Sequence, residues 1–278
     1  EISTRDWSSD VCSSDLAAGR RVGFVPTMGA LHAGHASLVA RAARECDAVA
    51  VSIFVNPTQF GPQEDFARYP RTLAADADLL APHGVEWIYV PEVSAVYPPG
   101  DATRVVVGGP AERFEGERRP GHFAGVATVV CRLFLAVPAD VAYFGAKDWQ
   151  QTLVVKRMVR DLGLPIEVVV CPTVREADGL AMSSRNAYLS STERPRAVGL
   201  WESLRTAERL WAAGVEPAVI EQAMRDALAA RGVEVDYAAV VAADSLEPLG
   251  ADAGPAVALV AGRLGSTRLI DNLELPAR

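Results

Sequence analysis

Short apolar runs alternate with longer helical segments through the first two thirds of this chain. Strands are expected over 21–25, 48–55, 87–90, 105–107, 141–144 and 166–170, and helices over 36–46, 71–81, 122–137 and 148–162. The run 48–55 is nearly continuous and rich in β-branched residues, which is typical of a strand covered on both faces. Strands that alternate with helices predict a parallel sheet wound by right-handed crossovers. The expected fold class is therefore α/β, a Rossmann-like doubly wound parallel sheet.

The sequence changes character beyond Pro172. Two alanine-rich helices are expected over 192–213 and 217–231, followed by strand-like segments over 235–241, 256–261 and 268–273. We therefore expect a first domain over 17–173 and a smaller α+β domain over 174–278, which we interpret as a lid. Residues 1–16 contain a near repeat, Ser-Ser-Asp-Val followed by Ser-Ser-Asp-Leu, and we interpret them as a segment that is not native.

Composition excludes several classes of protein. The formal net charge of −8 over 278 residues argues against non-specific nucleic-acid binding, which needs a basic face. No apolar run reaches the roughly 18 residues of a membrane span. The four cysteines are far apart and form no Cys-x-x-Cys pair, so neither a zinc site nor a disulfide framework is expected. A reducing cytoplasm is the compartment that this usage favours.

Two histidines, His32 and His35, fall where the first strand gives way to a helix. Backbone amides and the helix dipole favour phosphate at such a place, and Gly29 and Gly34 allow a ligand close to the backbone. The imidazoles could donate hydrogen bonds to a phosphate that gains charge in a transition state. A His-x-Gly-His segment here is typical of enzymes that attack the α-phosphate of a nucleotide. Chance spacing and metal binding are the alternatives.

Polar groups also follow the second and the fifth of these strands. Gln59 follows the run 48–55, and its amide suits the hydroxyl and carboxylate of a hydroxy acid. Lys147 supplies a point charge for phosphates, and Gln151 lies one helical turn further on. The carboxyl ends of parallel strands meet at one edge of a sheet, where ligands bind. The alternatives are a capped turn at Asn56 and a solvated Lys147–Asp148 pair at a helix start.

A further polar segment lies just beyond the predicted domain boundary. Residues 178–186, Asp-Gly-Leu-Ala-Met-Ser-Ser-Arg-Asn, are similar to the mobile Lys-Met-Ser-Lys-Ser loop of nucleotide-activating enzymes. Two hydroxyls and a guanidinium could clamp a triphosphate and then release pyrophosphate. A polar linker is the alternative. Arg113, Arg118 and Arg119 could add anion contacts, although a solvated face is the interpretation we favour for them.

Together these segments resemble the pantothenate synthetase (pantoate–β-alanine ligase) family of the His-x-Gly-His nucleotidyltransferases. The resemblance runs from about residue 19 to the C-terminus, with the blocks 25–35, 52–60, 67–72, 119–126, 145–151 and 178–186 in the family's order. Two departures stand out. Ala146 replaces a usual glutamate, and the family's N-terminal helix is missing or scrambled.

The resemblance implies a ligase that condenses pantoate with β-alanine through pantoyl adenylate, releasing AMP and pyrophosphate. It implies ATP as substrate, Mg²⁺ held mainly by the ATP phosphates, no metal site built from side chains, and a homodimer. It assigns pantoate to Gln59 and Gln151, with Gln59 also touching β-alanine. It assigns catalysis to His35, His32, Lys147 and Arg185, with His35 as the acid. The implied ATP contacts are Met28, Gly29, Ala30, Leu31, His32, Ala33, Gly34, His35, Gly145, Ala146, Lys147, Asp148, Val174, Met182, Ser183, Ser184 and Arg185.

The sequence leaves two enzyme alternatives to weigh, and one alternative from a different class of protein. A related nucleotidyltransferase would transfer AMP or CMP to a phosphate and leave it there. A tRNA-charging enzyme would need a basic anticodon-binding region, which this acidic chain lacks. A non-catalytic nucleotide sensor could keep the fold. The intact histidines, Lys147 and Ser183-Ser184-Arg185 argue against it.

Overall fold

The computed structural model describes residues 19–62, 64–250, 254–276 and 278, so the anomalous segment 1–16 lies outside the described residues. The chain divides into two compact units. The larger comprises residues up to Gly145 together with Gln150–Pro172, and the smaller comprises Ala146–Trp149 and Thr173–Arg278. The predicted boundary puts residues 146–149 in the first domain, whereas the structure groups them with the second. The cause is local, because Asn272 and Ala243 hold this short segment by hydrogen bonds.

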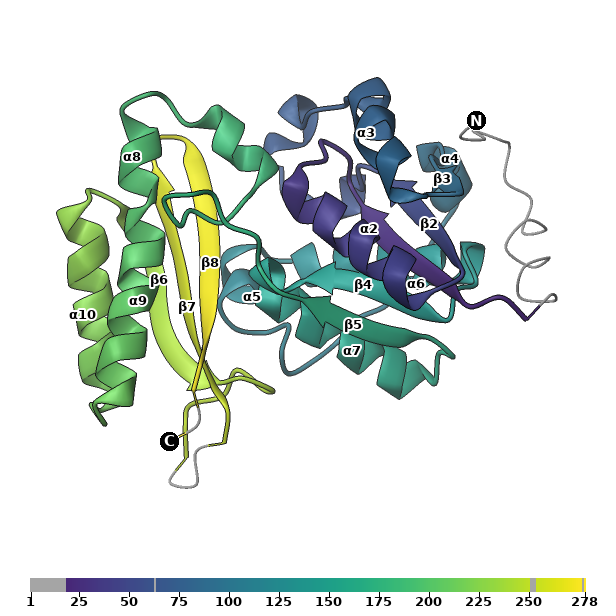
Figure 1. Cartoon of the computed structure of the whole chain (residues 1–278). Helices are drawn as coiled ribbons and strands as arrows, with labels where there is room; N and C mark the ends of the chain where they lie inside the picture. Colours follow the sequence, from purple (N-terminus) through teal and green to yellow (C-terminus); the bar gives the residue numbers. More distant parts are fainter. Residues whose placement is uncertain (1–18, 63, 251–253, 277) are drawn as a thin grey trace. The chain divides into compact units, whose positions relative to one another are not determined.

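The larger unit is built on a five-stranded parallel sheet (Figure 1). Its strand order is β3-β2-β1-β4-β5, so the chain reverses its direction of winding between β1 and β4. This confirms the doubly wound α/β class. The strands are β1 (Val22–Thr27), β2 (Ala48–Ile53), β3 (Trp87–Tyr89), β4 (Val141–Gly145) and β5 (Glu167–Cys171). The helices are α2 (Ala33–Glu45), α3 (Leu73–Leu80), α4 (Val93–Val96), α5 (Glu115–Arg118), α6 (His122–Ala136) and α7 (Trp149–Leu162).

Alternate residues of the strands enter two separate cores, one on each face of the sheet. Val22 and Phe24 pack with α6 and α7, whereas Val25 packs with α2 and α3. In the same way Phe144 enters the first core and Tyr143 the second. Both faces are thus covered by helices, which explains why β2 is apolar at every position except Ser52.

Two details of the predicted strands are wrong. The sequence predicts that Pro26 ends the first strand, but β1 continues to Thr27. Proline lacks an N–H, and β1 tolerates it because β4 pairs with β1 only at Gly23 and Phe24. Residues 105–107 form no strand. The N–H of Val105 donates to Oγ1 of Thr128 rather than to a neighbouring strand.

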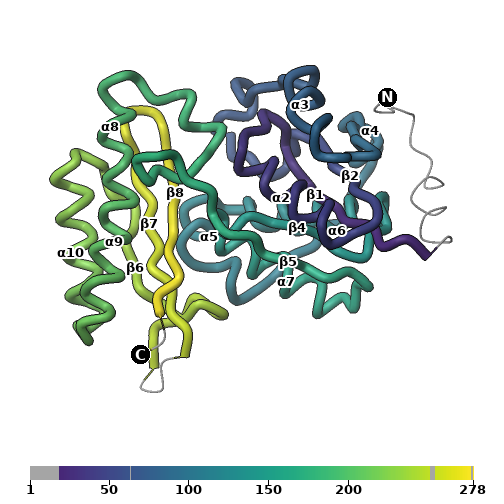
Figure 2. Tube along the Cα trace, in the orientation of Figure 1, coloured from purple at the N-terminus to yellow at the C-terminus, as the bar shows by residue number. Residues whose placement is uncertain are grey.

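The smaller unit has an antiparallel sheet of order β6-β7-β8, with its helices on one face (Figures 1 and 2). The strands are β6 (Glu234–Ala242), β7 (Ala256–Leu264) and β8 (Thr267–Leu275), and the helices are α8 (Glu193–Ala197), α9 (Gly199–Ala212) and α10 (Pro217–Ala230). The single helix expected over 192–213 is broken between α8 and α9. Gly199 sits there because a Cβ would come within 2.8 Å of the Arg231 side chain. Among the described residues, no helix is long and apolar enough to cross a membrane.

Candidate active site

The two histidine rings of the sequence motif lie against each other at the start of α2, with their planes tilted by 45°. Their ring centroids are 4.2 Å apart. Nδ1 of His32 accepts the N–H of Gly34 at 3.1 Å, and Nδ1 of His35 accepts the N–H of His32 at 3.3 Å. A neutral imidazole whose Nδ1 accepts a hydrogen bond carries its proton on Nε2. The helix cap therefore fixes the tautomer in which both rings offer Nε2–H as a donor.

The loop between β1 and α2 is held by a buried carboxylate that no sequence motif indicates. Asp76 on α3 is 2% exposed and accepts the N–H groups of Ala30 and Leu31 at 3.0 and 2.8 Å. Gly29 and Ala30 both have positive φ, 79° and 50°, so the loop turns tightly here. The N–H groups of Ala30 and Leu31 therefore donate to Asp76, and these two hydrogen bonds stabilise the conformation of the loop.

Gln59 is buried in a network at the end of β2. Its Oε1 accepts from Asn56 Nδ2 at 3.0 Å, and its Nε2 contacts Met28 Sδ at 2.9 Å. The second contact joins Gln59 to the loop that carries the histidines. Asn56 also donates to the carbonyl of Gly125, where a Cβ would come within 2.4 Å of the Thr58 carbonyl oxygen. The Asn-Pro segment thus caps a turn, as the alternative interpretation proposed, and that turn also presents Gln59.

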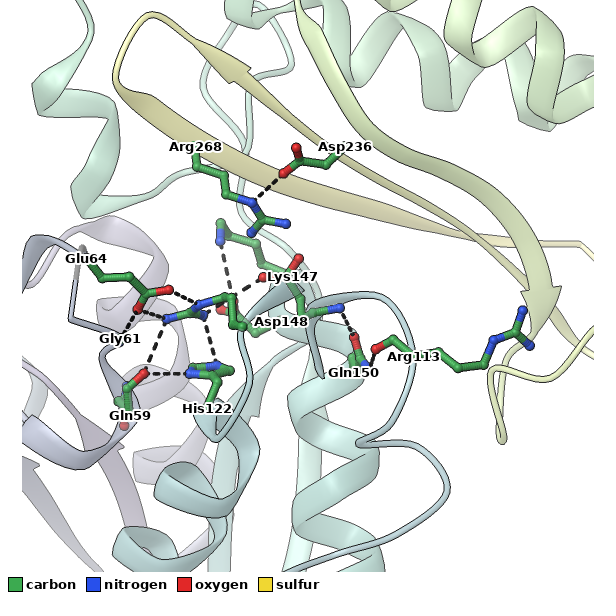
Figure 3. Close-up of polar contacts among 12 residues, drawn as sticks. Gln59, Gly61, Glu64, Arg113, His122, Lys147, Asp148, Gln150, Asp236 and Arg268 are labelled. Atoms are coloured by element: carbon green, nitrogen blue, oxygen red, sulfur yellow. Dashed lines mark hydrogen bonds and ion pairs between the residues drawn. The ribbon is translucent and has the colours of Figure 1, made fainter. Parts of the chain in front are cut away.

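A charged network holds the backbone carbonyl of Gln59 (Figure 3). His122 Nδ1 donates to the Gln59 carbonyl at 2.9 Å, and its Nε2 accepts from Arg119 at 2.9 Å. Arg119 also donates to both oxygens of Glu64, at 2.6 and 2.8 Å. Arg119 is therefore part of an ion pair inside the larger unit, and the solvated face expected for it is wrong. The sequence block Arg-Pro-Gly-His-Phe is the only signal that could have indicated this network.

Burial and neighbouring charge shift the pKa values of His122 and Glu64, two titratable partners of Arg119. Burial and the Arg119 charge lower the pKa of His122 to about 4, so the ring is neutral at pH 7. Burial would raise the pKa of Glu64, but the hydrogen bonds and charge of Arg119 outweigh it and hold that pKa at about 2. A neutral His122 can accept from Arg119 while it donates to Gln59, which is the arrangement observed.

We expect the shifted His122 pKa to make folding stability depend on pH between about 4 and 6.5. The unfolded chain binds the proton first as the pH falls, so stability is lost through this window and none is lost above it. The loss at pH 5 is roughly 2 kcal/mol. His122→Asn keeps a donor near the Nδ1 position but cannot titrate. Its free energy of unfolding, measured in urea, should therefore change less between pH 7.5 and pH 5 than that of wild type. Glu64 affects stability only below its ordinary pKa of 4.5, which separates the two groups. Equal pH dependence in wild type and His122→Asn would contradict this assignment.

Gln150 and Gln151 are neighbours on α7 but differ in their surroundings. Gln150 is 5% exposed, accepts the Glu115 N–H, and donates to the carbonyls of Pro110 and Arg113 (Figure 3). It therefore fixes the segment before α5. Gln151, the residue expected to touch pantoate, is half-buried.

In the smaller unit, Lys147 lies in a short 3-10 turn, Ala146–Asp148, that follows β4. The Lys147 side chain is 18% exposed, and its Nζ lies 3.6 Å from Asp148 Oδ1. Asn272 on β8 donates to the carbonyls of both Ala146 and Lys147, at 2.8 and 2.7 Å. The Lys147–Asp148 pair of the alternative interpretation is present, but its lysine is mostly buried rather than solvated, and the turn that carries it is held from β8.

The Met-Ser-Ser-Arg segment belongs to the same unit and is held there by backbone hydrogen bonds. The N–H of Met182 donates to the Val174 carbonyl at 3.0 Å, and Arg175 pairs with Ala181 in an antiparallel bridge. Ser183 then caps a 3-10 turn over Ser184–Tyr188 by accepting the Arg185 N–H. Val174 and Met182, two of the expected ATP contacts, are thus direct neighbours.

Most of the expected residues fall into two groups, one within each unit. The larger unit joins the histidine loop to Gln59 through Met28, and the smaller unit holds Lys147 and the 174–185 segment. The predicted domain boundary puts Lys147 and Arg185 in different domains, whereas the structure groups both with the smaller unit. Within the described part of the chain, no three His, Cys, Asp or Glu side chains form a group that could hold a metal ion.

Fold and site together define a class of protein. A doubly wound sheet with a capped His-x-Gly-His turn after its first strand is a nucleotide-binding architecture, in which the ligand meets the carboxyl ends of the central strands.

The comparisons with known proteins name the family. The model of the pantoate-beta-alanine ligase family matches residues 2–274. Pantothenate synthetase of Acidobacterium capsulatum is 54% identical over 267 residues, covering 92% of this chain and 86% of the relative. The Ruegeria pomeroyi pantothenate synthetase is 55% identical over 260 residues, covering 93% and 91%. This chain belongs to the pantoate–β-alanine ligase family.

Solved structures agree with this family. The pantothenate synthetase of Thermus thermophilus superposes with a TM-score of 0.90 at 52% identity, covering 95% of this chain and 98% of that one. The Francisella tularensis pantoate-beta-alanine ligase, solved with beta-gamma ATP and β-alanine, gives a TM-score of 0.78 at 34% identity, covering 95% and 94%.

Proposed function

We propose that this chain condenses pantoate with β-alanine at the expense of ATP, giving pantothenate, AMP and pyrophosphate. Membership of the pantoate–β-alanine ligase family supports the overall reaction. The observation that carries the mechanism is the capped pair His32 and His35, joined through Met28 to the buried Gln59. That pair supplies donors for a phosphate, and Gln59 supplies an amide for a hydroxy acid, within one unit of the fold.

The first step is attack of the pantoate carboxylate on the α-phosphorus of ATP. A P–O bond forms to the carboxylate, the bond to the bridging oxygen breaks, and pyrophosphate leaves. Negative charge grows on the α-phosphate oxygens, which Nε2–H of His32 and His35 can stabilise. Lys147 and Arg185 would stabilise the β- and γ-phosphates, because each has a cationic head group rich in hydrogen-bond donors.

The second step joins β-alanine to the activated acid. The amine attacks the acyl carbon of pantoyl adenylate, the C–O bond to AMP breaks, and the amine loses a proton. Gln59 and Gln151 are proposed to hold pantoate in both steps, and Gln59 also to contact β-alanine. The other proposed ATP contacts are those implied by the resemblance, 28–35, 145–148, Val174 and 182–185.

We also propose Mg²⁺ as a companion of ATP, held by phosphate oxygens and water. Held in that way, the ion would supply positive charge beside the leaving pyrophosphate. A homodimer in a reducing cytoplasm completes the proposal, and the free thiols of Cys46, Cys131 and Cys171 fit a reducing compartment.

Isotope exchange tests the adenylate mechanism directly. Labelled pyrophosphate should enter ATP when pantoate is present and β-alanine is absent, because the first step is then reversible on its own. No exchange should occur without pantoate. Exchange that strictly requires β-alanine, or products that contain ADP and phosphate, would contradict the proposal even if pantothenate formed.

A further inference from the structure

Two neighbouring residues of β8 contact both functional segments of the smaller unit. The first, Asn272, is 5% exposed, and its single amide nitrogen donates to the carbonyls of Ala146 and Lys147, at 2.8 and 2.7 Å. Both hydrogens of that amide are thus used on consecutive peptide groups. The 3-10 helix they hold is only three residues long, so two hydrogen bonds from β8 fix most of its backbone.

Asp271 holds the second segment through Arg175. Its carboxylate is 3% exposed and accepts both ends of the Arg175 guanidinium, at 2.6 and 3.1 Å. Arg175 also donates to the carbonyls of Asn272 and Gly179, and its guanidinium lies 3.9 Å from the Trp201 ring centroid. Arg175 directly follows Val174 and bridges to Ala181, so Asp271 anchors the base of the segment that carries Ser183, Ser184 and Arg185.

The two anchors are themselves coupled. The N–H of Asn272 donates to Oδ1 of Asp271 at 2.8 Å, so the carboxylate that holds Arg175 also orients the backbone that carries the Asn272 amide. A buried amide or carboxylate is costly unless it is fully hydrogen-bonded. Apart from the Asn272 N–H, the described hydrogen-bond partners of both side chains belong to the two segments assigned to phosphate.

We propose that Asn272 and Asp271 are positioning residues for the adenylation step. Asn272 sets the turn that carries Lys147, and Asp271 sets the base of the 174–185 segment. This inference rests on the proposed function, which assigns Lys147 and Arg185 to the phosphates. Neither β8 residue touches ATP or pantoate in the proposal, and each acts through the backbone that it holds.

The test compares Asn272→Ala with Ser203→Ala. Ser203 is a matched control because it is buried in the same unit and its Oγ donates to a backbone carbonyl, that of Leu200, within α9. We expect Asn272→Ala to lower the rate of pantoate-dependent pyrophosphate exchange by roughly 10- to 100-fold, with the pantoate KM unchanged, because small displacements of a catalytic group have effects of that size. Ser203→Ala should leave the exchange rate near that of wild type.

A double-mutant cycle separates positioning from a general loss of structure. If Asn272 acts through Lys147, Asn272→Ala should change the exchange rate by less than about threefold when Lys147 is already alanine. An equal loss in both backgrounds would overturn the inference. If Asn272→Ala does not fold, Asn272→Ser is measured in its place, with the same two outcomes.

Amide hydrogen exchange of residues 146–149 tests the same idea without turnover. Asn272→Ala should speed exchange of these amides by about tenfold or more relative to wild type, and Ser203→Ala should not. Unchanged protection would overturn the inference. Wild-type protein that shows no pantoate-dependent pyrophosphate exchange would overturn the proposed function instead, while hydrogen exchange would still decide whether Asn272 holds this turn.

Discussion

Replacing His35 by alanine is expected to slow formation of pantoyl adenylate by about 10²- to 10³-fold, the usual cost of removing one preorganised donor to a developing oxyanion. The reason lies in the cap of α2. Nδ1 of His35 accepts the His32 N–H, so the proton sits on Nε2, where it can serve a phosphate. Single-turnover assays with ATP and pantoate, without β-alanine, measure this step alone.

Two further variants separate chemistry from capping. His35→Asn keeps an acceptor near the Nδ1 position and so can retain the hydrogen bond from His32, but it has no group at Nε2. We expect it to fold like wild type and to be as slow as His35→Ala. His83→Ala, in the 3-10 helix after α3, is the control and should react at the wild-type rate. Near-normal adenylate formation by His35→Asn would show that capping, and not donation from Nε2, is what His35 contributes.

Much of the fold was predictable because its signals are local. A parallel strand covered on both faces is apolar at nearly every position, and in β2 the single exception is Ser52. The helices α6 and α10 begin and end within a residue of the expected bounds, since their apolar periodicity is strong. The strand predicted over 105–107 is absent for the opposite reason, because it depended on a distant partner. Three valines suit a strand, but strand formation needs a partner, and the Thr128 hydroxyl takes the Val105 N–H instead.

Some residues of the candidate site were also predictable from local sequence signals, and others were not. Groups that face a ligand in the proposal stand beside strand ends and carry recognisable chemistry, so His32, His35, Gln59 and Lys147 could be named from spacing. The residues that hold these side chains in place could not be predicted from the sequence. Asp76 contacts the histidine loop from 46 residues away, and Asn272 contacts Lys147 from 125 residues away. A single aspartate or asparagine forms no sequence motif, so its contacts become visible only in the structure.

Lys147→Ala should reduce the rate of adenylation by about 10²-fold or more while the affinity for pantoate stays nearly unchanged, because the lysine is assigned to phosphate and not to the hydroxy acid. Only two of the 27 Lys and Arg residues in this chain are lysine, so an ammonium at this position is unusual for the protein. An ammonium is a compact point charge with three donors, whereas a guanidinium is a planar fork. The Lys147 side chain is also largely buried beside Asp148. We therefore expect Lys147→Arg to recover only part of the lost rate.

Lys156→Ala is the matched control, because Lys156 is the other lysine and lies exposed on α7. It should react like wild type. Arg185→Ala should resemble Lys147→Ala, since the proposal gives both cations the same leaving group. The measurements are single-turnover rates at saturating ATP, with pantoate binding followed separately by calorimetry. If Lys147→Ala lost pantoate affinity and kept its adenylation rate, the lysine would belong to the hydroxy acid, and the assignment of the turn after β4 to phosphate would be wrong.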